Sequence, residues 1–286
     1  MQLRNHRLFV EAPLKVNLRP ICDFQWGTEG FDEGLFERMY RETVSDRHSL
    51  TIGLGDYVDS WRPTVRERFQ NAMSGDIGAQ QQLDNMHRDH MDKMITKLHL
   101  KELFSAGYGC LGLLDGHHYL KYLNGDTSTK YLCRVLNLPY LGEMSAFIRM
   151  SFTGKNPSVK SIGDLVIHAQ HGEGGSQYIA SDTSKLERKT LPNFEADIYL
   201  RGHSTKLYSG GTDVLHITKS DPPRLVARPK VWLNAGGFMR GYLEDETTYV
   251  EKKMLTPAKL GYGVIHIGLA YDNRGASKRW DIRVTT

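Results

Sequence analysis

Residues 49–59 read SLTIGLGDYVD, and this stretch decides the fold because an apolar run gives way halfway along to glycine and aspartate. Residues 49–54 form an apolar run of strand length, and Gly55, Asp56 and Asp59 follow directly. Glycine allows the backbone to turn sharply, so that short polar side chains can come together. In an open α/β sheet, such groups gather in the loops beyond the carboxyl ends of the strands. The stretch therefore predicts a strand followed by a loop that places carboxylates at the edge of the sheet where a functional site forms.

Four further segments repeat this pattern of an apolar run followed by Asp, His or Gln beside glycine. They are residues 23–27, 116–118, 168–172 and 202–205, which read DFQWG, GHH, HAQHG and GHST. One such segment is ordinarily a turn, but five in succession indicate a shared site. Carboxylates and imidazoles are the ligands that divalent metals require. The sequence therefore predicts a metal site where these strands end.

Apolar periodicity predicts an alternating order of elements in the first half of the chain. Strands are expected at 15–22, 49–54 and 108–114, helices at 33–46 and 127–136, and a helical insert at about 62–106, broken near 74–78. Strands become more frequent afterwards, with candidates at 146–152, 165–169, 198–200, 231–234, 263–270 and 280–284. Asp221 and two following prolines indicate an exposed loop over 213–230. No composition shift marks a linker, so residues 1–286 are expected to form a single domain.

Composition indicates a soluble protein with a mild excess of basic residues. The net charge of +4 suits an anionic substrate such as a phosphate ester, but it is too small to establish nucleic-acid binding. Cys22, Cys110 and Cys133 lie in apolar runs without a CxxC pair, as expected for core residues in a reducing compartment. No apolar stretch approaches the roughly 20 residues that span a bilayer, and residues 1–11 lack a signal-peptide core. A cytoplasmic location is therefore expected, with no membrane partner.

The five polar segments, in this order, resemble the motifs of the calcineurin-like metallophosphoesterases. That family carries Asp-x-His, Gly-Asp-x-x-Asp, Gly-Asn-His-Asp/Glu, a later His, and Gly-His-x-His; here residues 55–59 match in full and the resemblance spans 16 to about 208. It implies an α/β fold, a four-layer α/β/β/α sandwich of two mixed β-sheets flanked by helices, with later residues supplying outer strands of the second sheet. It also implies metal-dependent hydrolysis of phosphate esters by a metal-activated water, with a diester favoured over a monoester. Nucleotides and nucleic acids fall within that substrate class.

The resemblance also implies two sets of metal ligands that share one carboxylate. The first set is Asp23, Gln25, Asp56 and Thr205, and the second is Asp56, His117, His171 and His203. Gln25 and Thr205 stand where the family has histidine, and His117 stands where it has asparagine. Three imidazoles and a carboxylate favour zinc, manganese or iron, whereas oxygen donors alone suit Mg²⁺ or Mn²⁺, loosely held, or no ion. One or two divalent ions per chain are therefore expected; Gln25 is left open as a ligand, and Thr205 is favoured as a bystander.

Two residues beside these ligands have implied roles in the chemistry. The family's equivalent of His118 contacts the phosphate and can protonate the leaving oxygen, a task that suits a histidine pKa. Asp59 would orient loops or a ligand without touching metal. The competing interpretation is structural: Asp56 and Asp59 would cap a helix beginning near Pro63, and His117, His118 and His203 would be loop residues.

Several alternatives remain open at this level. His168 and His171 compete for one ligand position, and His171 is favoured because it precedes glycine whereas His168 lies within the apolar strand. His87, His90 and His99 are expected to be solvated on a helix. Residues 173–176, EGGS, resemble a phosphate-cradling loop only weakly. The alternative function is a metal-binding scaffold or binding protein that retains the fold with weak or no catalysis, and it is motivated by Gln25 and Thr205.

Overall fold

The computed structural model describes residues 1–59, 75–155, 161–173, 178–245, 247–252, 254, 256–271 and 278–286. The first part of the expected helical insert, residues 62–74, lies outside the described residues, as do residues 174–176 of the EGGS segment.

The first sheet has six strands in the order β12-β11-β2-β3-β4-β5. Its parallel part contains β2 (Lys15–Ile21), β3 (Ser49–Gly53), β4 (Cys110–Leu114) and β5 (Tyr140–Gly142). On the other side, β11 (Val264–Tyr271) pairs antiparallel with β2, and β12 (Lys278–Thr285) pairs antiparallel with β11 at the edge of the sheet. The expectation that all later residues extend the second sheet is therefore wrong for these two strands. The apolar pattern predicts a strand but carries no information about its pairing partner.

The second sheet also has six strands, in the order β1-β6-β7-β8-β10-β9. They are β1 (Gln2–Val10), β6 (Ser145–Gly154), β7 (Gly163–Gln170), β8 (Ile198–Arg201), β10 (Leu225–Ala235) and β9 (Leu207–Ile217). The exposed loop predicted over 213–230 is confirmed only for residues 218–224, which contain Asp221 and both prolines. Residues 213–217 and 225–230 belong instead to the long antiparallel hairpin of β9 and β10, in which Asp213 pairs with Pro229. Proline and charged residues in the exposed arm of the hairpin conceal the strand pattern. Strand β1 was not predicted either, because it is an edge strand whose side chains are mostly exposed and include several charged and polar residues.

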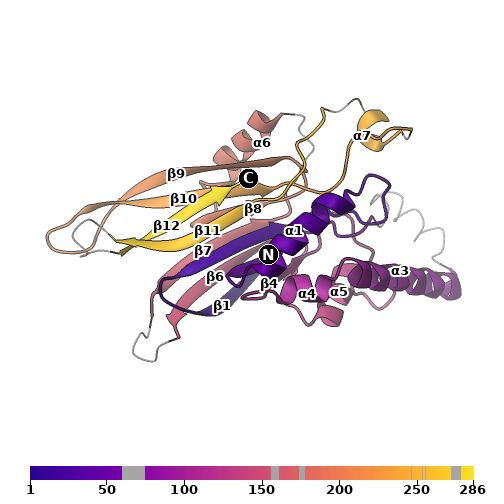
Figure 1. The fold of residues 1–286 in the computed structure, drawn as a ribbon, viewed down its shortest axis with the longest axis horizontal. Coiled ribbons are helices and arrows are strands. Elements are labelled where there is room, and N and C mark those ends of the chain that lie inside the picture. The colour runs from indigo at the N-terminus through magenta and orange to yellow at the C-terminus, as the bar shows by residue number, and fades with distance from the viewer. Residues whose placement is uncertain are drawn as a thin grey trace.

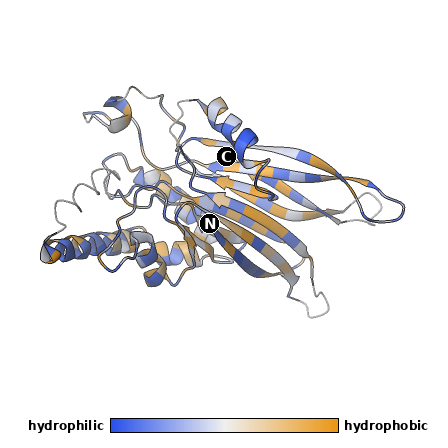
Figure 2. Cartoon of the chain, turned by 180° about the vertical axis from the view of Figure 1, so that it is seen from behind, coloured by the Kyte–Doolittle hydropathy of each residue, from blue (hydrophilic) through white to orange (hydrophobic). Residues whose placement is uncertain are grey.

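The two sheets pack face to face on one apolar core. Alternate side chains of both sheets enter it, among them Leu18, Leu50 and Ile52 from the first and Ile148, Ile167 and Leu200 from the second. Figure 2 shows the resulting concentration of hydrophobic residues along the central strands. The predicted pair of mixed sheets is confirmed.

Helices cover the outer faces of both sheets (Figure 1). Four lie against the first sheet: α1 (Glu33–Ser45), α3 (Ile77–Lys97), α4 (Leu100–Ser105) and α5 (Ser128–Leu136). Helix α6 (Ile179–Lys185) and the π-helix η1 (Leu186–Thr190) accompany the second, where Leu186 packs on Tyr199 and Trp232. A short helix, α7 (Tyr249–Lys252), lies in the connection to β11. The predicted four-layer α/β/β/α order is thus confirmed, with one thick and one thin helical layer.

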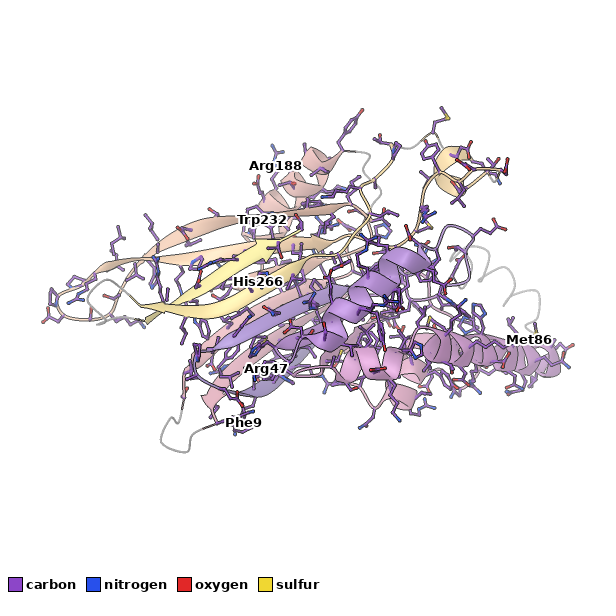
Figure 3. The ribbon with its side chains drawn as sticks, viewed as in Figure 1. Phe9, Arg47, Met86, Arg188, Trp232 and His266 are labelled. Carbon is purple, nitrogen blue, oxygen red and sulfur yellow. The ribbon has the colours of Figure 1, made fainter. Side chains whose placement is uncertain are left out.

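Helix α3 corrects the expectation that its histidines are solvated. His87 is only 7% exposed, and its Nδ1 lies 3.0 Å from the hydroxyl of Tyr122. His90 is half-buried with its ring 4.5 Å from that of Trp26, and only His99 is exposed. Met86, the neighbour of His87, is 71% exposed (Figure 3). The helix packs one face on the loop before α5. Because apolar residues are only weakly segregated along the helix, the sequence does not predict which face is buried.

His168 is a packed residue of the second sheet, as expected. It points to the outer face of β7, is 1% exposed, and stacks on Phe194 at a centroid distance of 4.6 Å. Neither ring nitrogen has a hydrogen-bond partner among the described residues. Burial lowers the pKa of His168 to about 4.

We expect His168→Phe to stabilise the protein, and to do so more at low pH. The unfolded chain binds a proton at His168 near pH 6.5 and the folded chain only near pH 4, so the wild type loses stability as pH falls between these values. Phenylalanine keeps the ring packing and binds no proton. Urea unfolding should give a gain about 2 kcal/mol larger at pH 5 than at pH 7.5. A gain that does not vary with pH would contradict this account.

Candidate metal centre

The predicted polar segments meet at the edge where the strands of both sheets end. The loops after β2, β3 and β4 come from the first sheet, and those after β7 and β8 from the second. Backbone hydrogen bonds join them: Asp23 N donates to Gly55 O at 3.1 Å, and Asp56 N donates to Asp115 O at 3.3 Å. Gly202 N donates to His171 O at 3.1 Å. The loops therefore form one connected surface on which side chains are held by backbone contacts.

Five residues of the predicted segments have a left-handed backbone, which non-glycine residues seldom adopt. Their φ angles lie between 45° and 69°, at Asp23, Gln25, Asp56, His203 and Thr205. Each such conformation costs on the order of 1 kcal/mol or more, and for a β-branched threonine it is a genuine outlier. Such strain persists only where the surrounding structure enforces it, so these positions are specified by more than turn formation.

Asp56 is the central carboxylate of the site and is 1% exposed. Its Oδ1 accepts hydrogen bonds from the backbone N–H groups of His117 at 2.7 Å and His118 at 2.8 Å. Its Oδ2 is thereby turned toward His171. Burial raises the pKa of Asp56, but the charge of His171 and these hydrogen bonds outweigh burial, so the net pKa is lowered. Asp56 is therefore ionised at neutral pH.

His171 presents one defined nitrogen to this carboxylate. Its Nδ1 lies 2.8 Å from the carbonyl oxygen of Leu54, which can only accept, so the proton is on Nδ1. Its Nε2 lies 3.1 Å from Asp56 Oδ2, within ion-pair distance but without hydrogen-bond geometry. Burial lowers the pKa of His171, yet the Asp56 carboxylate outweighs it and raises the pKa to about 9. A ring oriented by a backbone carbonyl in this way is typical of metal-binding histidines.

His117 and His203 complete the group. Their Nδ1 atoms are 3.2 Å apart, and burial together with the neighbouring histidines lowers the pKa of His203 to about 4. One ligand atom from each of Asp56, His117, His171 and His203 lies within 4.8 Å of all the others. Three imidazoles and one carboxylate in this arrangement fit a transition-metal ion. This cluster could hold a divalent metal ion.

The other implied ligands lie beside this cluster and not in it. Asp23 is fully buried; its Oδ2 accepts from His203 N at 2.9 Å, and its Oδ1 has no partner among the described residues. Burial raises the pKa of Asp23 to about 6. The Thr205 side chain approaches Asp23 across Gly237, since a Cβ built there lies 3.1 Å from Asp23 Cβ and 3.3 Å from Thr205 Cβ. The Gln25 amide makes no hydrogen bond within the described part of the chain, although its backbone N donates to Asp56 O at 3.0 Å.

His118 and Asp59 form a pair at the open side of the cluster. His118 Nδ1 lies 3.3 Å from Asp59 Oδ1, and the two side chains are 22% and 38% exposed. The pair is thus anchored through His118 N to Asp56 and accessible to a solute.

Two supporting residues were not identified from the sequence. Asp115 is buried directly before Gly116 and accepts a hydrogen bond from Thr127 Oγ1 at 2.7 Å, which braces the loop of His117. Asn234 is buried at the end of β10 and donates to Ser204 Oγ at 3.0 Å, beside His203. Residues 234–237, NAGG, follow an apolar run and carry the same polar-glycine signal as the five segments. That signal could have identified Asn234.

Comparisons with known proteins found similarity among solved structures, at low identity. No protein-family model and no curated protein matches the sequence. Among solved structures, Vps29 from Entamoeba histolytica is 10% identical, covers 95% of this chain and 100% of its own, and has a TM-score of 0.36. Vps29 from Cryptosporidium parvum is 13% identical, with 95% and 98% covered and a TM-score of 0.35. GAP50 of Plasmodium is 10% identical, with 94% and 89% covered and a TM-score of 0.38.

Across the residues that the structure describes, no helix combines the length and apolarity needed to cross a bilayer.

The close approach of the loops predicts a selective effect of alanine at Gly116. Gly116 and Gly125 have the same φ of +81°, but a Cβ at Gly116 would lie 2.4 Å from Asp56 Oδ1, whereas one at Gly125 would meet nothing within 4 Å. Both changes should cost about 1–2 kcal/mol in backbone strain. Only Gly116→Ala should add about 1–3 kcal/mol from steric overlap. Urea unfolding of both variants tests this, and equal losses would count against the described packing.

Proposed function

We propose that this protein is a metal-dependent phosphoesterase that hydrolyses phosphate esters, diesters in preference to monoesters. One observation supports this most strongly: the convergence of Asp56, His117, His171 and His203 beside the accessible His118–Asp59 pair. A bound divalent ion at such a site polarises a phosphoryl oxygen and lowers the pKa of a water molecule. Nucleotides and nucleic acids are the diester substrates we consider first, and the net charge of +4 is compatible with them.

The protein's own residues would prepare this chemistry by fixing the ligand atoms in advance. Two backbone amides hold Asp56 Oδ1, so that only Oδ2 turns toward the ion position. The carbonyl of Leu54 holds the Nδ1 proton of His171, so that Nε2 is the nitrogen that would lose its proton and face the ion. Preorganised donors of this kind lower the reorganisation that binding would otherwise require.

His118 would serve as the general acid. Asp59 lies at Nδ1 and would orient the ring, and Nε2 would donate a proton to the leaving oxygen. A charged imidazole would also attract a phosphate oxygen before the reaction. Asp59 is thus a positioning residue, and His118 is the residue that we propose contacts substrate.

A second, weaker ion position is proposed at Asp23 and Asp56, with Gln25 as a possible neighbour through its oxygen. The supporting observation is the fully buried Asp23 Oδ1, which lacks a partner among the described residues. A buried carboxylate oxygen requires a proton or a cation. Oxygen donors favour Mg²⁺ or Mn²⁺ here over zinc.

A second candidate function is metal binding without efficient catalysis, in a scaffold or binding protein. Gln25 and Thr205 favour it, because both keep strained backbones yet supply no imidazole where the implied family has one. Metal content and hydrolysis measured on the same preparation separate the two candidates. A bound ion without turnover of a generic diester supports the scaffold.

Asp56→Asn should abolish diester hydrolysis and sharply reduce the metal retained after dialysis, since the amide removes the charge shared by both ion positions. Asp84→Asn is the matched control, because Asp84 is also buried (5% exposed) but accepts a hydrogen bond from Leu123 N, away from the cluster. Elemental analysis and turnover with added Mn²⁺ measure both effects. Undiminished turnover of the Asp56 variant would refute the proposed function.

His118→Ala should lower the hydrolysis rate by roughly 10²–10⁴-fold, the usual range for loss of a general acid. The loss should be greatest for substrates with poor leaving groups, because good leaving groups need no proton. Metal content should stay unchanged. A variant that loses its metal would show instead that His118 is a ligand.

A further inference from the structure

A hollow of about 350 Å³ opens beside the candidate metal centre, on the outer face of the second sheet. Ser145, Gln170 and Arg201 line it from the sheet, and Lys185, Lys189 and Thr190 line it from α6 and η1. Arg188, labelled in Figure 3, marks η1 in that layer. None of the four cluster residues is among the described lining residues.

The strand period explains why this hollow is separate from the cluster. Ala169 and Leu200 point into the core between the sheets, so Gln170 and Arg201, one position later, point to the outer face. His171 and His203 then follow in the loops and turn toward the cluster. The ends of β7 and β8 therefore contribute residues to both the hollow and the histidine cluster.

Arg201 is the notable residue of the hollow, because its charge is buried without a matching carboxylate. It is 5% exposed; its Nη1 donates to the carbonyl oxygen of Asp182 at 3.0 Å, and its Nε has no partner among the described residues. No carboxylate in the described part of the chain lies within ion-pair distance of it. The nearby Asp182 carboxylate is paired with Lys206 at 3.5 Å. A buried guanidinium in this situation calls for an anion.

Two lysines bring further positive charge to the same place. Lys189 Nζ lies 3.2 Å from Glu173 Oε1 at the rim, and Lys185 has no ion pair within the described chain. Lys185, Lys189 and Arg201 line the same hollow as Glu173. Three cations against one exposed carboxylate leave the hollow with an excess of positive charge. The Thr190 hydroxyl and Gln170 amide add neutral donors 3.5 Å apart.

We propose that this hollow binds the phosphate group of a phosphorylated ligand. Arg201, Lys185 and Lys189 would supply the charge, and Thr190 and Gln170 would supply neutral hydrogen bonds. Arginine and lysine together are the usual partners of a phosphate dianion. Glu173 competes with that group for Lys189. The site is separate from the proposed hydrolytic function and does not depend on a metal ion.

Calorimetric titration of inorganic phosphate into the full chain, stripped of metal by chelation and in phosphate-free buffer, tests this. Replacing both lysines, Lys185→Gln with Lys189→Gln, should weaken binding by at least roughly tenfold, the value of one charge-assisted hydrogen bond. Glu173→Gln should tighten binding severalfold, because it removes the competing carboxylate. Lys219→Gln is the matched control, since Lys219 is exposed at the tip of the β9–β10 hairpin and should not alter binding.

Three results would overturn the proposal. The first is no binding at phosphate concentrations of tens of millimolar, and the second is equal affinity in the wild type and the double variant. The third is binding that appears only after metal is restored, which would place the phosphate at the histidine cluster. Because no turnover is measured, these results do not depend on whether the protein is a phosphoesterase.

Discussion

The carboxylate of Asp56 is the interaction on which the site depends. Its Oδ1 accepts two backbone amides from the loop after β4, although Asp56 itself follows β3. Its Oδ2 faces His171 from the other sheet at 3.1 Å. One buried anion thus joins three loops and both layers of strands. Its charge also compensates the burial of His171, whose ring would otherwise be driven toward the neutral form.

The histidine cluster and the cationic hollow share a structural origin. Strands β7 and β8 end side by side, and at each end an outward-facing residue is followed within two positions by a residue of the cluster. At one end Gln170 faces outward and His171 joins the cluster; at the other, Arg201 faces outward and His203 joins the cluster. Two parallel strand ends therefore place imidazoles on one side and a guanidinium on the other. The arrangement needs no additional loop or domain.

The sequence predicts the site better than the outer parts of the fold. The residues of the cluster were all expected, because a polar residue beside glycine after an apolar run is a local signal. His171 was favoured over His168 because it precedes glycine at the end of the apolar strand, and the structure places His168 among phenylalanines. Asp115 was missed because it supports the His117 loop through a tertiary contact with Thr127, whereas Asn234 carries the local polar-glycine signal that was not applied to residues 234–237.

The errors in the fold have a common physical reason. Strands β11 and β12 were expected in the second sheet but belong to the first, where β11 pairs with β2 and β12 with β11, since pairing depends on contacts across most of the chain. The exposed arm of the β9–β10 hairpin carries Asp213, Arg228 and Pro229, so its composition is that of a loop. His87 lies on a helix with weak periodicity, and its burial is decided by Tyr122 from another segment. Local patterns do not encode these long-range choices.

The separation of the cluster residues along the chain has a consequence for how the protein folds. Asp56 and His203 are far apart in the chain and meet across strands of both sheets, and the first sheet includes two strands from the last part of the chain. Such contacts carry a large loop-closure entropy and are made late, which favours slow folding. An ion at this site would therefore bind the finished fold and could not act as a nucleus for its formation. At a free concentration 100 times its Kd, the ion would stabilise the native state by about 2.7 kcal/mol through mass action alone.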